Sequence, residues 1–132
     1  MEFTSQHWKT INLPFNFSDN PIIFTQLVTD NEATAATVRL RNVTQNQFEI
    51  RLQEAEIDDS IHVQESVAWM AMEGGTQTTD YQFQADTIPV THGWATVSFF
   101  ERFDNIPLFF ANMQTTRDAD AATLRNLSLI HI

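Results

Sequence analysis

The chain repeats part of itself at a distance of 86 residues. When the sequence is shifted by that distance, 11 of the 32 residues between positions 8 and 39 match a later residue without a gap. The matched pairs include Trp8/Trp94, Phe17/Phe103, Pro21/Pro107, Phe24/Phe110, Thr29/Thr115, Thr37/Thr123 and Arg39/Arg125. A period this long is that of whole small domains in tandem, because solenoid repeats run about 20 to 50 residues. We therefore predict one complete module followed by the opening part of a second.

The correspondence stops after Arg39 and Arg125. A two-residue deletion would realign residues 42–44 with residues 126–128. Alternatively, residues 127–132 are a non-native tail of the kind that sequencing-adapter read-through adds to an open reading frame. Under both explanations the second copy lacks its later strands. The predicted organisation is a β-sandwich module over 1–75, a linker or edge segment over 76–93, and a truncated second repeat over 94–132.

The charge and the absence of cysteine exclude several classes of function. Seventeen acidic residues against seven basic ones give a net charge of −10, which repels phosphate backbones and anionic lipid, so we expect neither nucleic-acid binding nor binding to a membrane surface. No stretch reaches the roughly 18 apolar residues of a membrane span, so we expect no membrane insertion. Without cysteine the chain has no disulfide, no thiolate zinc site and no cysteine nucleophile. A hydrophobic content of 42%, with 11 Phe and 3 Trp, is enough for a packed core.

Alternation of apolar and polar residues predicts strands over most of the first module. The strand-like segments are 9–13, 21–28, 37–43 and 48–53, and turn-forming residues bound them. The last two flank the short polar stretch 44–47, so we predict an antiparallel hairpin. Helical signals are confined to residues 33–36, which are too few to form a stable helix.

The segment 65–73 is apolar on both faces. Val67, Trp69 and Ala71 would point to one side, and Ala68, Met70 and Met72 to the other. Such a strand is either central in its sheet or placed at a subunit contact. Residues 76–93 are polar and are expected to supply at most a short edge strand. The predicted fold class is all-β, an antiparallel sandwich of about six strands followed by a partial second copy.

The order of these elements resembles the H-type lectin domain, and resembles still more the tandem form of that domain in bacterial surface or secreted proteins. The matching residues are Trp8, Phe15, Phe17 and Pro21, then residues 38–44 followed by Phe48, and finally residues 66–71; residues 92–125 match the first half again. The resemblance implies a six-stranded antiparallel β-sandwich that commonly forms trimers and binds sugar near the subunit boundaries.

The sugar site of that family is matched less well than its fold. Family lectins specific for N-acetylgalactosamine have an arginine four residues before the position of Arg39, where this chain has Ala35. Their Trp-His pair falls near Ile57 and Asp58, and neither residue is kept. The resemblance therefore implies the fold but not that particular sugar.

The densest group of carboxylates is formed by Glu54, Glu56, Asp58 and Asp59, with His62 close behind. Calcium takes six to eight oxygen ligands from loops of this kind, but the order of an EF-hand and its glycine are absent, so a solvated acidic loop is the expected outcome and no metal site is predicted. Neighbouring carboxylates would favour the protonated form of His62.

Trp8 is the remaining candidate, because an exposed indole can stack on the face of a sugar, although burial as a strand anchor is the commoner role. We take His62, Asp58, Asp59 and Trp8 as candidate carbohydrate-binding residues. A glycosidase would need two carboxyl groups roughly 5 to 9.5 Å apart, for which only Glu54 and Glu56 are candidates.

The sequence thus predicts a non-catalytic carbohydrate-binding module of a larger extracellular or cell-surface protein. We expect no cofactor and no catalytic residues, with glycans as partners and a homo-trimer as the assembly. The alternative is a structural spacer or adhesin repeat that has no ligand.

Overall fold

The computed structural model describes residues 2–3, 7–54, 63–117, 119 and 122–124 of the 132-residue chain. These residues contain strands and no helix. The strands are β1 (Glu2–Phe3), β2 (Lys9–Asn12), β3 (Ile22–Leu27), β4 (Ala36–Arg41), β5 (Gln47–Glu54), β6 (Glu65–Met72), β7 (Gly75–Thr78) and β8 (Gln82–Ala85). The all-β class predicted from the sequence is confirmed.

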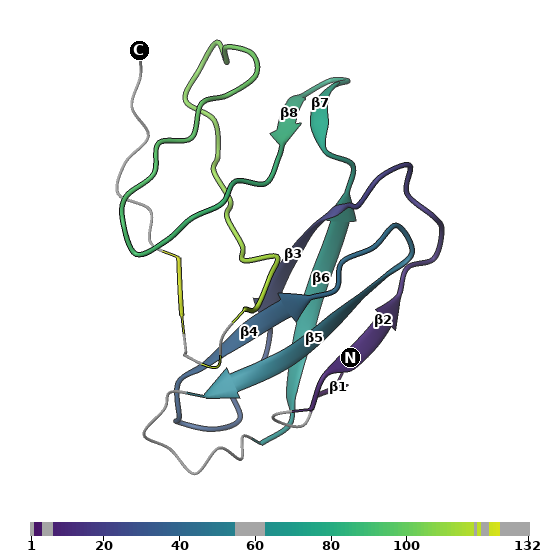
Figure 1. Cartoon of the computed structure of the whole chain (residues 1–132), viewed down its shortest axis with the longest axis vertical. Helices are drawn as coiled ribbons and strands as arrows, with labels where there is room; N and C mark the ends of the chain where they lie inside the picture. The colour runs from purple at the N-terminus through teal and green to yellow at the C-terminus, as the bar shows by residue number, and fades with distance from the viewer. Residues whose placement is uncertain (1, 4–6, 55–62, 118, 120–121, 125–132) are drawn as a thin grey trace.

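The strands form three antiparallel sheets (Figure 1). One has the order β1-β6-β3, a second has the order β2-β5-β4, and β7 and β8 pair only with each other. The predicted hairpin is the β4–β5 pair, in which Leu40 lies opposite Ile50. Strands β5 and β6 are each the central strand of their sheet. For β6 this agrees with one of the two predictions made from residues 65–73, which are apolar on both faces.

Strand β5 shows how alternation in the sequence becomes a core. Phe48, Ile50 and Leu52 are fully buried, whereas the side chains between them are only half-buried. Side chains of adjacent strand residues point to opposite faces, so this alternation places one face of the sheet inward. Ile11 of β2 lies opposite Phe48 in register and is buried with it.

The other sheet supplies the facing side of the same core. Ile23 of β3 and Val67 of β6 are buried against the β5 residues, and Trp69 packs edge-on against Phe48 with ring centroids 5.6 Å apart. The buried cluster is Ile11, Leu13, Phe17, Ile23, Leu40, Phe48, Ile50, Leu52 and Val67. Each large apolar side chain fully buried in this way stabilises the fold by about 1.5–3 kcal/mol.

The loop between β4 and β5 is held by backbone hydrogen bonds. Thr44 N–H donates to the Gln47 carbonyl at 2.8 Å, and Asn42 has a φ of 49°. Asparagine is among the residues that tolerate this left-handed region best. The same loop accepts hydrogen bonds from the backbone N–H groups of Leu13 and Phe17, so the segment after β2 is tied to it.

The 76–93 region differs from the sequence expectation of a single edge strand. It begins inside a two-stranded hairpin, β7–β8, that is closed by a hydrogen bond from Thr79 N–H to the Tyr81 carbonyl at 3.1 Å. Gly75, at the start of β7, has a φ of 97°, which a residue with a Cβ rarely adopts. The two-residue strand β1 was also not predicted, because residues 2–3 are too few to show alternation.

The region matching the second copy has no strand among its described residues, although the sequence predicts early strands there. Val97 is 41% exposed, whereas its counterpart Ile11 is 3% exposed. Leu108 is 88% exposed, whereas its counterpart Ile22 is 9% exposed. At these two positions the apolar side chain that is buried in the first copy is therefore exposed in the second, whose described residues form no sheet.

Candidate functional site

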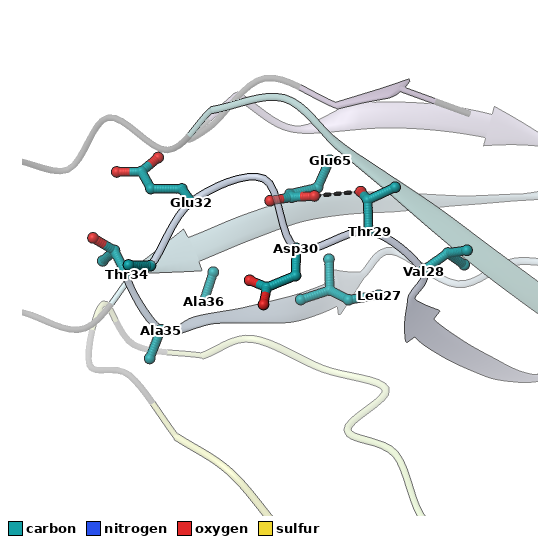
Figure 2. Close-up of a pocket in the computed structure, with 10 residues that line it drawn as sticks. Leu27, Val28, Thr29, Asp30, Glu32, Thr34, Ala35, Ala36 and Glu65 are labelled. Carbon is teal, nitrogen blue, oxygen red and sulfur yellow. Dashed lines mark hydrogen bonds between the residues drawn. The ribbon is translucent and has the colours of Figure 1, made fainter.

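A surface hollow lies where the loop after β3 crosses the start of β6 (Figure 2). Its volume is about 420 Å³. It is lined by Leu27, Val28, Thr29, Asp30, Glu32, Ala33, Thr34, Ala35, Ala36 and Glu65. The loop that forms most of this lining joins β3 of one sheet to β4 of the other, so the hollow lies where the two sheets are connected.

The floor of the hollow is fixed by a buried carboxylate. Glu65 is 2% exposed and accepts hydrogen bonds from the Thr29 hydroxyl and from the Asn31 N–H, the latter at 2.7 Å. The Thr29 oxygen in turn accepts the Ser66 N–H at 2.8 Å. A buried charge is tolerated only when it is paired or hydrogen-bonded. These contacts therefore hold the loop in one position against β6.

The rim carries oxygen acceptors beside small apolar groups. Asp30 is exposed, and Glu32 accepts the backbone N–H of Val63 at 2.7 Å. Figure 2 shows the carboxylates of Asp30 and Glu32 pointing in different directions. Ala35 and Ala36 also line the hollow, and Ala36 is the first residue of β4. Carboxylate and hydroxyl oxygens next to an apolar surface can hydrogen-bond the hydroxyl groups of a polar ligand while its nonpolar face rests on the alanines.

Three of the four predicted site residues, Asp58, Asp59 and His62, lie outside the described residues. The described chain resumes at Val63, which follows His62 directly and is bonded to Glu32 at the rim of the hollow. Trp8, the fourth, lies next to β2 and is not among the residues lining the hollow. The structure therefore does not bring Trp8 together with the hollow.

Trp8 lies beside arginines on the outer face of the β2-β5-β4 sheet. The guanidinium carbon of Arg41 lies 4.1 Å from the centroid of the indole, and that of Arg51 lies 4.8 Å from it. Cation–π contacts of this kind are worth about 0.5–1 kcal/mol at exposed sites. Trp8 is half-buried by these neighbours, which fits the role of a strand anchor better than that of an open stacking surface.

The arginines gather because they occupy matching positions on paired strands. Arg39 lies opposite Arg51 in the β4–β5 register, and both donate to the side-chain oxygen of Gln53, at 3.1 and 3.4 Å. Arg41 forms an ion pair with Glu49. Burial lowers the pKa of Arg51, and the positive charges of Arg39 and Arg41 lower it further. This face is a local concentration of positive charge in an acidic protein.

The part of the chain that the structure describes contains no group of three or more His, Asp or Glu residues arranged to hold a metal ion. It also contains no helix long and apolar enough to cross a membrane.

Sequence reasoning missed Thr29 and Asp30 as site residues, and it did not anticipate the arginine face. Thr29 meets Glu65 across 36 residues of chain, so no local pattern reveals the contact. The arginine face did leave a signal, because Arg39 and Arg41 alternate with apolar residues and Arg51 does the same on the following strand.

Comparison with known proteins gives one informative relative. The chain is similar to Halomucin from Haloquadratum walsbyi (strain DSM 16790 / HBSQ001), with 32% identity over 130 residues. That alignment covers 90% of this chain, so it spans parts of both copies of the repeat, but it covers 1% of the length of Halomucin. No protein-family profile matches the chain, and no solved structure matches it.

Proposed function

We propose that this chain is a non-catalytic carbohydrate-binding module of a larger extracellular or cell-surface protein, and that the hollow after β3 is its glycan site. The supporting observation is the hollow itself: about 420 Å³, with an exposed carboxylate, threonine hydroxyls and alanine methyls held in place by buried Glu65. Ligand sites generally combine such an apolar surface with a few fixed polar groups.

Two further observations support the extracellular location and the lectin-like fold in this proposal. Halomucin is, by its name, a mucin, and a mucin-like parent would be a secreted or surface protein. The resemblance to tandem H-type lectin domains points to the same setting. It also supports an arrangement in which the six strands β1 to β6 form the β-sandwich of that family. In this proposal Asp58, Asp59 and His62, which precede Val63 in the chain, contribute to the same site, because the Val63 N–H donates to Glu32 at its rim.

The experiment is a glycan array probed with the labelled full chain. The informative variant is Asp30→Ala, which removes the exposed carboxylate of the hollow. The matched control is Asp80→Ala, which removes an exposed carboxylate in the β7–β8 turn and changes the net charge equally. We expect a subset of glycans to be retained by the wild type and by Asp80→Ala, and lost by Asp30→Ala, with no change on adding EDTA.

Two outcomes would count against the proposal. If the wild-type chain retains no glycan, the proposed binding function is wrong. If Asp30→Ala retains the same glycans as the wild type, the glycan site is not in the hollow. Far-ultraviolet circular dichroism of each variant ensures that a loss of binding is not a loss of fold.

The second candidate function is a structural spacer without a ligand. It is favoured by one specific observation: side chains of the second copy are hydrogen-bonded to strands of the first, as in a chain whose repeats support one another. A chain that binds no glycan but retains these contacts would fit this candidate.

A further inference from the structure

Among the residues that the structure describes, strand β3 has β6 on one side and no strand on the other. Hydrogen-bonded and non-hydrogen-bonded pairs alternate along an antiparallel ladder. Val28 N–H donates to the Ser66 carbonyl at 2.9 Å, which sets the phase of this alternation. Ile23, five residues earlier, therefore has its N–H and C=O directed away from β6. These groups face the open edge of the sheet, where an unpaired strand invites association with another chain.

The side chain of Gln114 occupies this edge position. Its oxygen accepts the Ile23 N–H at 3.2 Å, and its amide nitrogen donates to the Ile23 carbonyl at 2.5 Å. A side-chain amide carries the same donor and acceptor as a peptide group, so it can satisfy both backbone groups at once. Asn112 adds a bond from the Thr25 hydroxyl to its side-chain oxygen at 3.1 Å.

The same segment reaches the other sheet. The Thr116 hydroxyl donates to the Leu40 carbonyl of β4 at 2.9 Å, and the Ala119 carbonyl accepts the side-chain amide of Gln53 of β5 at 2.7 Å. At its other end, Phe110 packs edge-on against Phe24 of β3, with ring centroids 6.4 Å apart. In Figure 1 this yellow-green segment runs beside β3 and β4.

The residues that make these bonds belong to the second copy and are not repeated in the first. Asn112, Gln114 and Thr116 occupy the positions of Gln26, Val28 and Asp30. Valine carries no amide, so Val28 cannot bond an edge peptide as Gln114 does. The two copies are therefore not interchangeable at this contact: the first offers the edge and the second supplies the side chains.

We propose that residues 110–117, which we call the clasp segment, join neighbouring repeats by closing the β3–β4 side of the repeat that precedes them. The partner of this surface is thus the next copy of the repeat in the same protein. The first copy in this chain is completed by residues of the second copy, so the two copies are not independent of each other. This inference does not depend on the proposed glycan site.

The test is hydrogen–deuterium exchange of the full chain, because it reports the opening of single backbone groups. The informative variant is Gln114→Leu, which keeps most of the volume of the side chain and removes both polar groups. The control is Gln77→Leu in β7, where the side chain is exposed. The readout is the exchange rate of the Ile23 amide relative to that of Ile50, which lies in the central strand β5, between β2 and β4.

We expect Gln114→Leu to raise the Ile23-to-Ile50 ratio by about tenfold or more, because the Ile23 N–H loses its acceptor. Gln77→Leu should leave the ratio within about twofold of the wild type, since it touches no edge group. An unchanged ratio in a folded Gln114→Leu chain would overturn the proposal. If that variant does not fold, Gln114→Ala removes the same two polar groups without adding an apolar side chain, and the same ratio decides in the same way.

Discussion

At the scale of single residues, Trp69 links the two sheets of the first module. It lies on β6, is half-buried, and packs edge-on against Phe48 of β5. We expect Trp69→Ala to lower the free energy of unfolding by about 3 kcal/mol, the lower end of the range for large aromatic side chains removed from cores. Thermal unfolding measures this. Met70→Ala, next in the chain but 56% exposed, should change stability by less than about 0.5 kcal/mol. Equal melting temperatures for both variants would contradict the assigned faces of β6.

Glu65 and Thr29 form the second residue-scale contact that can be tested. Because the Thr29 hydroxyl donates to the buried carboxylate, losing either partner removes a hydrogen bond to a charged group that is shielded from solvent. Thr29→Val and Glu65→Gln should each destabilise by about 1–3 kcal/mol. The loss of unfolding free energy in the double variant should be smaller than the sum of the two single losses, by about 0.5 kcal/mol or more, because the residues are in contact. Urea unfolding of the four chains gives this coupling, and full additivity would show that the bond contributes nothing.

At the scale of elements, the sequence predicted the strands that carry alternation and missed those that do not. Strands β3, β4, β5 and β6 fall within one or two residues of their predicted limits, because either alternation or an apolar run between turn-forming residues marks each of them. The β7–β8 hairpin is polar throughout its first strand, Gly75–Thr78, so nothing in its residues distinguishes it from a loop.

The candidate site was harder to predict from the sequence than the strands were. The hollow exists because Thr29 and Asn31 meet Glu65 after the chain has folded, and Glu65 stood out in the sequence only as a residue before an apolar strand. The predicted residues Asp58, Asp59 and His62 lie outside the described residues, so their role in the site stays a prediction.

The outer face of β6 is the element for which assembly can be tested. Ala68 and Met70 are exposed there, and Phe24, opposite Met70 in register, packs on Phe110. The sequence predicts either a subunit interface or the 76–93 segment as the cover of this face. The structure shows a different cover: Phe110 of the second copy packs on Phe24, next to Met70. Met70 itself is still exposed.

We propose that the open part of this face is a homo-trimer contact. Sedimentation velocity of the full chain should then show trimers that increase with concentration, and Met70→Glu should yield monomers with an unchanged circular dichroism spectrum. A charge buried without a partner at an interface is strongly unfavourable, which is why one substitution suffices. Val90→Glu, at an exposed residue of the 76–93 segment, is the control and should leave the trimer intact. A wild-type chain that stays monomeric at high concentration would contradict this assembly.

At the scale of the whole molecule, the balance of charge sets how stability responds to salt. The net charge is −10, and three of the seven basic residues, Arg39, Arg41 and Arg51, lie together on the outer face of one sheet. The remaining surface is therefore more acidic than the net charge alone suggests. Like charges repel one another more strongly in the compact chain than in the unfolded one, so this surface opposes folding.

Added salt should relieve that repulsion and raise the melting temperature. The screening length falls from about 10 Å at 0.1 M salt to about 3 Å at 1 M, which is shorter than most separations between surface carboxylates. Salt also weakens the half-buried Arg41–Glu49 pair, but ion pairs at a protein surface contribute only about 0–1 kcal/mol, so relief of repulsion should prevail. Thermal unfolding at increasing sodium chloride concentrations measures the slope of the melting temperature against salt concentration.

The double variant Asp80→Asn, Asp104→Asn removes two exposed negative charges, so its melting temperature should rise less steeply with salt than that of the wild type. An equal slope would mean that salt acts through water or the apolar core, and a falling melting temperature would mean that attractive charge pairs outweigh the repulsion.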